Sequence, residues 1–155
     1  MWNSKRSIIL STVVCWLLAA ILVVLGVFAP SLFRHYMVTF RGFEAGSEAL
    51  LQLNWVFVLC FYPAALFAGW ILYSLLKLLG NLRLDQVFVS ENVAHLKSVS
   101  WCCFAIGGIT LTGSVFYLPF LFVAAAGGFV GILLRVLKNV MEHAVALRAE
   151  NDLTI

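Results

Sequence analysis

Four long apolar stretches limit what this chain can fold into more than any other feature of its sequence. They cover residues 7–29, 51–79, 99–116 and 119–134. A helix rises about 1.5 Å per residue, so roughly 20 mainly apolar residues cross a bilayer core about 30 Å thick, and all four stretches are about that long. With 63% hydrophobic and 11% charged residues, and a mean hydropathy of +1.03, the composition is typical of a polytopic membrane protein. We therefore predict an all-α fold in which residues 1–155 form a single membrane domain, a bundle of four transmembrane helices.

The basic residues are distributed unevenly over the segments that join these stretches. Arg34 and Arg41 are the two in the first loop. The other eight of the ten lie before the first stretch, in or beside the connection between the second and third, or after the fourth. Those eight are Lys5, Arg6, Lys77, Arg83, Lys97, Arg135, Lys138 and Arg148. Because short cytoplasmic segments carry an excess of Lys and Arg, we predict that both termini and the central loop are cytoplasmic. The expected location is the bacterial inner membrane, with the lipid bilayer as surroundings. The scattered charge of +3 argues against a direct nucleic-acid partner.

The first stretch is followed by Pro30, which lacks a backbone donor, so we expect the helix to end there. The stretch is longer than the apolar region of a secretory signal peptide, which predicts an uncleaved membrane helix. Residues 32–50 are not a plain polar linker, because apolar and aromatic residues recur at spacings of one, three and four. This pattern fits a helix lying in the membrane interface or an irregular loop packed over the helix ends, and both alternatives stay open.

Small residues indicate how the third and fourth helices pack. The short connection of residues 114–118 makes them antiparallel neighbours, and Gly127 and Gly131 form a G-x-x-x-G pattern on the fourth. Glycines four residues apart let two helix backbones approach closely. We favour packing within one chain, while a homodimer held by the same glycines is the alternative.

The residues that would carry catalysis are missing or dispersed. The central portions of the four stretches contain no Asp, Glu, Lys or Arg, so the usual sign of an intramembrane ion or proton path is absent. His35 is expected outside and His95 and His143 inside, so the three cannot jointly hold one metal. A His95/His143 pair with Glu91 or Glu142 at the cytoplasmic surface is geometrically possible, but we favour ordinary surface histidines on solvated helix faces. The cysteines lie inside apolar stretches and have the character of small buried hydrophobes. We therefore expect a protein that is not an enzyme and that has no catalytic residue, no metal site and no cofactor.

Three features are expected together at the cytoplasmic surface. In the central loop, Ser90 is well placed to cap a helix that leads into the third span, with Glu91 complementing the helix dipole. The fourth helix continues past residue 134, with apolar residues at helical spacing, as an amphipathic cytoplasmic extension. The chain then ends in a short polar segment with an apolar tip.

Two of these segments resemble a bacterial membrane family, domain of unknown function 2975. The residues that carry the resemblance are Phe88, Glu91, Asn92 and Leu96 in the loop, and Glu150, Asn151, Asp152, Leu153, Thr154 and Ile155 in the tail. The resemblance implies a four-span layout and no established activity. Members of that family are encoded beside a small helix-turn-helix regulator, which implies a membrane partner that restrains that regulator or senses for it.

The functional hypothesis is that these same ten residues form a docking surface for a small helix-turn-helix transcription regulator. Acidic groups beside apolar anchors suit a partner that is basic because it binds phosphate. The chain would then act as a membrane-bound sensor or antagonist. A small oligomeric transporter or channel, or an immunity-type membrane protein, is the alternative function. The tail could instead fold back, with Glu150 or Asp152 pairing with Arg83 or Lys97.

Overall fold

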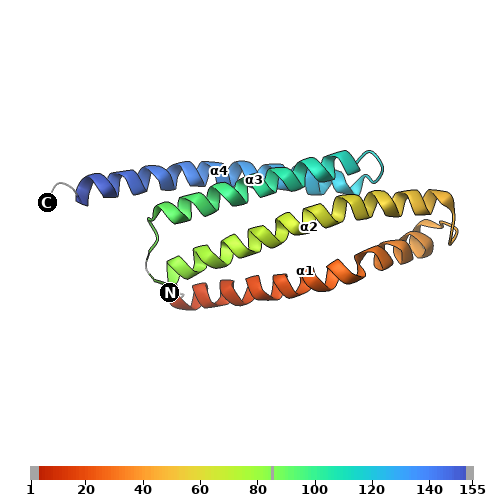
Figure 1. Cartoon of the computed structure of the whole chain (residues 1–155), viewed down its shortest axis with the longest axis horizontal. Coiled ribbons are helices and arrows are strands. Elements are labelled where there is room, and N and C mark those ends of the chain that lie inside the picture. The colour runs from red at the N-terminus through yellow and green to blue at the C-terminus, as the bar shows by residue number, and fades with distance from the viewer. Residues whose placement is uncertain (1–3, 85, 153–155) are drawn as a thin grey trace.

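The structure is a computed structural model that describes residues 4–84 and 86–152. All regular secondary structure within these residues is α-helix, with α1 (Ser4–Arg41), α2 (Glu48–Arg83), α3 (Ser90–Gly113) and α4 (Pro119–Asp152). Successive helices are antiparallel, so the chain passes back and forth between two ends of the molecule (Figure 1). We call the end on the left in Figure 1 basal and the end on the right apical. The basal end carries the start of α1, the 84–89 connection and the end of α4, and the apical end carries the 42–47 and 114–118 connections. The predicted all-α fold is confirmed.

Among the described residues, α1, α2 and α4 are each long and apolar enough to cross a membrane. Helices of this kind indicate a multi-pass membrane protein. α3, which contains the third predicted span at residues 99–116, is not among them, so length and composition do not establish the full number of four spans. α3 lies between α2 and α4 and buries more of its surface than its neighbours do.

The expected end of the first helix at Pro30 is wrong, because α1 continues through this proline to Arg41. Pro30 has no N–H to donate to the carbonyl of Gly26 four residues earlier. The Tyr62 hydroxyl of α2 donates to that carbonyl instead, at 3.0 Å. Membrane helices tolerate proline where a neighbouring helix satisfies the freed carbonyl in this way. The helix ends at Gly42, whose φ of 70° is the left-handed conformation that terminates many helices.

The segment after Pro30 forms the apical core. Residues 32–41 are helical, as one of the two alternatives proposed, but they extend α1 and bury part of their apolar face inside the protein. Phe33, Met37 and Leu50 are buried there. The Phe33 ring stacks on Phe57 of α2 at 4.2 Å and meets Tyr117 edge-on at 5.6 Å. Aromatic rings from α1, α2 and the 114–118 connection therefore hold the apical end together.

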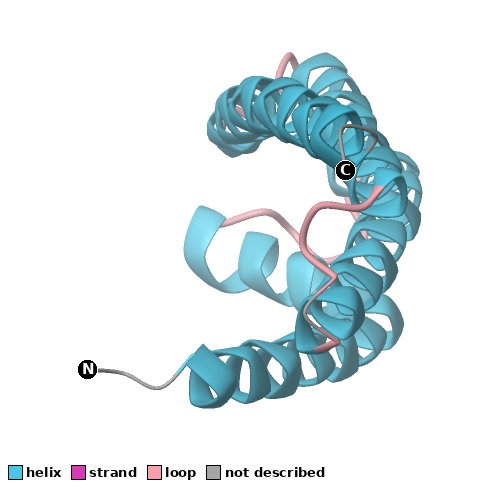
Figure 2. Cartoon of the chain, turned by 90° about the vertical axis from the view of Figure 1, so that its left-hand side faces the viewer, coloured by secondary structure: helices cyan, strands magenta, loops and turns pink. Residues whose placement is uncertain are grey.

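The four helices lie along an open arc instead of closing into a compact bundle. Figure 2, viewed from the basal end, shows this curve. Within the described residues the packed pairs are α1–α2, α2–α3 and α3–α4, and α1 does not pack against α4. Each packed pair shares a side-chain hydrogen bond: Tyr62 to Gly26, Trp70 Nε1 to Ser98 Oγ (2.8 Å), and Ser100 Oγ to the Gly131 carbonyl (2.8 Å).

Glycines bring α3 and α4 into close contact. A Cβ added at Gly127 would lie 3.1 Å from the carbonyl oxygen of Cys103 and 3.4 Å from the Cα of Gly107. A Cβ added at Gly131 would lie 3.1 Å from the ring of Phe104. Both glycines of the G-x-x-x-G pattern thus face α3 of the same chain.

Two smaller expectations about α3 and the cysteines have different outcomes. Ser90 is not the N-cap: Val89 occupies that position without a side-chain cap, and Ser90 is the first helical residue. Valine has no side-chain oxygen that could accept from the first backbone N–H groups, so α3 begins without a side-chain cap. The four cysteines are free and buried, as predicted.

Candidate functional site: the basal end

The basal end brings together the segments that the sequence singles out for docking. The 84–89 connection, the start of α3 and the last turns of α4 all lie there (Figure 1). Leu153, Thr154 and Ile155 of the proposed docking surface lie outside the described residues. The remaining candidates are placed by two local structures, a hydrogen-bonded connection and a projecting helix.

Asn92 organises the connection between α2 and α3. Its side chain is only 3% exposed and donates to the carbonyls of Gln86 and Val87, both at 2.8 Å. Its own carbonyl oxygen accepts from Asn81 Nδ2 of α2, also at 2.8 Å. Buried polar networks of this kind fix a single conformation when every member is satisfied. Asn92 therefore positions the connection instead of presenting its amide to a partner.

The other loop candidates divide between interior and surface. Leu96 is buried. Phe88 is 45% exposed, and the Glu91 carboxylate is largely exposed while it accepts from Asn81 Nδ2 at 3.2 Å and lies 3.8 Å from His95 Nε2. Of the four loop residues predicted to bind a partner, the structure leaves Phe88 and Glu91 accessible.

The end of α4 extends past the start of α3. Ser100 lies beside Gly131 and Gly107 beside Ala124, so in this antiparallel pair the start of α3 at Ser90 falls roughly opposite residue 141. The last residues of α4 consequently have no α3 alongside, and residues 146–150 are all exposed. Figure 1 shows this end of α4 as the farthest basal point of the described chain. The helical extension predicted beyond residue 134 is confirmed as a helix.

Charged side chains follow the outer surface of this extension. Lys138 Nζ donates to the Glu142 carboxylate four residues later. This hydrogen bond, and then the charge of the same Lys138, hold the pKa of Glu142 below its usual value. Glu142 is therefore ionised at neutral pH. Glu150 is exposed near the end of the helix, and Asn151 and Asp152 complete it.

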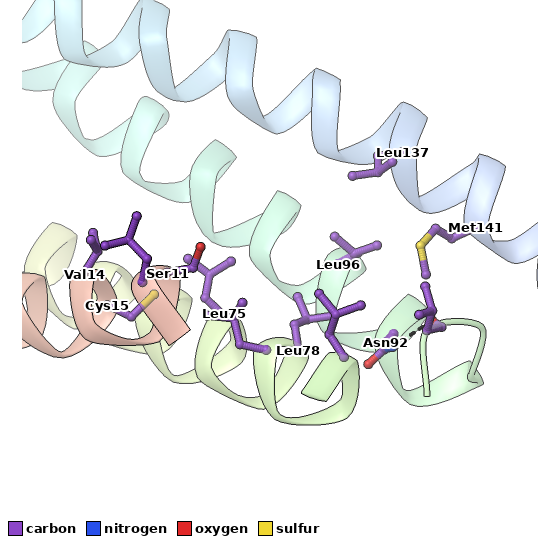
Figure 3. A pocket seen from close by; sticks show the side chains of 13 residues that line it. Ser11, Val14, Cys15, Leu75, Leu78, Asn92, Leu96, Leu137 and Met141 are labelled. Carbon is purple, nitrogen blue, oxygen red and sulfur yellow. Dashed lines mark hydrogen bonds between the residues drawn. The ribbon is translucent and has the colours of Figure 1, made fainter. Parts of the chain in front are cut away.

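The concave side of the arc contains an apolar groove at this end. It has a volume of about 510 Å³, and all four helices line it. Figure 3 shows Leu137 and Met141 of α4 across from Leu75 and Leu78 of α2, with Leu96 between them. The groove exists because α1 and α4 do not meet. Within the described residues, no group of three or more His, Cys, Asp or Glu side chains could hold a metal ion.

Residues 42–155 match the family described as "Protein of unknown function (DUF2975)". The chain belongs to this family. The match covers α2, α3 and α4 together with both docking segments, and it begins where α1 ends. No curated protein and no solved structure matches the chain.

Two features of the basal end of this DUF2975 protein were not predicted from its sequence. One is the role of Asn92, although an asparagine two residues into a helix after an extended turn is typical of side chains that bond back to a loop. The other is the groove, whose walls are visible in the sequence as the leucines of α2. The sequence predicts a transmembrane helix for these leucines. No residue pattern predicts that α1 and α4 stay apart and leave a groove between them.

Proposed function

We propose that this DUF2975 protein is a non-enzymatic protein of the bacterial inner membrane that crosses it four times, with the basal end in the cytoplasm. The charge distribution supports this orientation, since Arg34 and Arg41 lie toward the apical end and the other eight basic residues toward the basal end. α3 packs along both α2 and α4, so it runs through the same layer as they do. That α3 is not among the helices apolar enough to cross by composition alone fits a central helix that faces protein on two sides.

The orientation is tested by fusing alkaline phosphatase, which is active only outside the cytoplasm, at Glu44 and at Gly80. Glu44 lies in the apical 42–47 connection and Gly80 close to the basal end of α2. We expect activity from the Glu44 fusion alone. Activity from the Gly80 fusion alone would reverse the orientation, and equal activity from both would contradict a single topology.

The function that the basal end supports best is docking of a small helix-turn-helix transcription regulator. The observation that carries this proposal is the projecting end of α4, where Leu147 is 65% exposed on a part of the helix that extends past the start of α3. A lone helix with an apolar residue and nearby carboxylates offers an anchor and a charge that complements a basic DNA-binding domain. Exposed Phe88 supplies a second apolar contact at the same end. Holding the regulator there would keep it from DNA, so the chain would act as a membrane-bound antagonist.

The test first establishes whether a helix-turn-helix protein is encoded beside the gene. Binding of that protein to the full-length chain in detergent micelles is then measured by titration. We expect Leu147→Asp to weaken binding at least tenfold, because burying a leucine contributes roughly 1.5–3 kcal/mol. A chain that ends at Ala149 keeps Leu147 but loses residues 150–155, with their two carboxylates and Leu153, and should also bind more weakly. Val115→Asp makes the same change at an exposed apical residue and is the matched control. Equal binding by all variants would remove the end of α4 from the interface, and no binding by the full-length protein would refute the docking function.

A further inference from the structure

We propose that the basal boundary of α3 and α4 carries a binding site for an anionic phospholipid, on a different part of the molecule from the docking surface. A small cleft of about 30 Å³ lies between these two helices, lined by Lys97, Ser100, Arg135 and Lys138. The cations come from both helices, and the Ser100–Gly131 hydrogen bond and the glycine contacts hold the helices in register. The charges are therefore positioned before any ligand arrives.

The cleft has an excess of positive charge. Lys138 pairs with Glu142, and this is the carboxylate whose pKa is also lowered by the charge of Lys97. Within residues 4–84 and 86–152, neither Lys97 nor Arg135 forms a salt bridge. Three cations thus face one carboxylate, and the balance of two positive charges suits a ligand with net negative charge.

The surroundings of the cleft favour a lipid phosphate over a free one. The Arg135 guanidinium lies 5.1 Å from the centre of the Trp101 ring, which is 55% exposed. Tryptophan is enriched at the headgroup level of membrane proteins. Lys97 and Arg135 also flank the basal limits of the predicted spans at residues 99 and 134. This placement rests on the proposed four-span arrangement.

Open space for an acyl chain lies next to the charges. Gly108 is seven residues after Trp101 and Gly128 is seven before Arg135, so each glycine lies on nearly the same helix face as its partner, two turns toward the apical end. A Cβ added at Gly108 or at Gly128 would meet nothing within 4 Å. A phosphodiester held by Lys97 and Arg135 would then direct its acyl chain past Trp101 toward the open space at Gly108 and Gly128. The ligand class is a glycerophospholipid with a negatively charged headgroup.

The experiment measures thermal unfolding of the full-length protein in maltoside micelles that contain increasing palmitoyl-oleoyl phosphatidylglycerol. Bound ligand stabilises the folded state, so the midpoint should rise and saturate. Equal amounts of palmitoyl-oleoyl phosphatidylcholine, or inorganic phosphate without lipid, should not produce this rise. The variant Lys97→Gln/Arg135→Gln should bind roughly 25-fold more weakly, because each basic residue near an anionic headgroup contributes on the order of fivefold. Lys77→Gln/Arg83→Gln, which removes two basal charges outside the cleft, is the matched control and should bind normally.

A second measurement covers the case in which the cleft variant fails to fold. Phosphatidylglycerol brominated on its acyl chains should quench the tryptophan fluorescence of the unaltered protein more than brominated phosphatidylcholine does, and Trp101→Phe should remove that difference. The proposal is overturned if phosphatidylcholine stabilises equally, if inorganic phosphate alone reproduces the rise, or if the control variant loses binding as much as the cleft variant. It is also overturned if quenching does not depend on the headgroup. Each of these results is independent of whether a regulator docks on α4.

Discussion

The contact between α3 and α4 makes a sharp prediction, because two adjacent glycines of α4 have opposite surroundings. A Cβ at Gly127 would lie 3.1 Å from the Cys103 carbonyl oxygen and 3.4 Å from backbone atoms of Gly107. A Cβ at Gly128 would meet nothing within 4 Å. Backbone atoms cannot rotate away as a side chain can, so alanine at position 127 forces the two helices apart.

The magnitude follows from comparing Gly127→Ala with Gly128→Ala. Both changes replace glycine by alanine in the same helix, so both gain about 1 kcal/mol of helix propensity, and this gain cancels in their difference. What remains is the overpacking at position 127, which costs about 1–3 kcal/mol. We therefore expect Gly128→Ala to be neutral or slightly stabilising, and the free energy of unfolding of Gly127→Ala to be about 1–3 kcal/mol lower than that of Gly128→Ala.

The assay is reversible unfolding in mixed micelles with increasing dodecyl sulfate, followed by far-ultraviolet circular dichroism. Gly107→Ala and Gly108→Ala repeat the comparison on α3, where a Cβ at Gly107 would lie 3.3 Å from the Ala124 carbonyl oxygen and one at Gly108 meets nothing. Equal unfolding free energies within either pair would refute the described packing. If Gly127→Ala instead left the unfolding free energy unchanged and dissociated an oligomer in light scattering, the glycines would join two chains.

Three further predictions concern polar groups inside the fold. Tyr62→Phe should lower the unfolding free energy by about 1 kcal/mol, because it leaves the Gly26 carbonyl, freed by Pro30, without a donor. Tyr73→Phe at an exposed position should not, and equal effects would contradict the role of Tyr62 as the replacement donor. Asn92→Ala should lower the unfolding free energy by about 2 kcal/mol or more and speed proteolysis of the α2–α3 connection, because two carbonyls lose their donor. Unchanged proteolysis would count against the hydrogen-bond network. Asn54 has a buried carbonyl oxygen with no partner among the described residues, so Asn54→Leu should be neutral or stabilise by about 1 kcal/mol, and liposomes with either protein should show no ion flux. Flux that Asn54→Leu abolishes would favour the transporter or channel interpretation.

The parts of the fold that the sequence predicted depend on short-range signals. The α3–α4 hairpin follows from a five-residue connection and from glycines whose spacing places them on one helix face. The continuation of α4 beyond residue 134 follows from apolar residues that keep their helical spacing after the charges return. Such patterns specify a helix and its nearest neighbour, and here the structure agrees with them.

The parts that the sequence could not predict depend on groups far apart in the chain. Pro30 predicts a helix end unless another helix supplies a donor, and that donor is Tyr62. Asn92 is a polar residue at a helix start, and only the folded connection shows that its amide points inward. The open arc also depends on residues far apart in the chain. Local patterns specify the packing of successive helices, but they do not tell whether α1 and α4 would pack together and close the bundle.

The proposed lipid site and the proposed docking site both include residues of α4, so the length of this helix determines how far apart they lie along the membrane normal. Arg135 and Leu147 are twelve residues apart on α4, which is roughly 18 Å along the helix axis if α4 stands near the membrane normal. The headgroup layer on one side of a bilayer is about 5–7 Å thick. If Arg135 holds a lipid phosphate, Leu147 lies more than about 10 Å beyond the headgroups, in water, with no other helix alongside it. A lipid site at Arg135 would thus set the height at which α4 presents its exposed end, and a soluble partner would reach that end without displacing any contact within the bilayer.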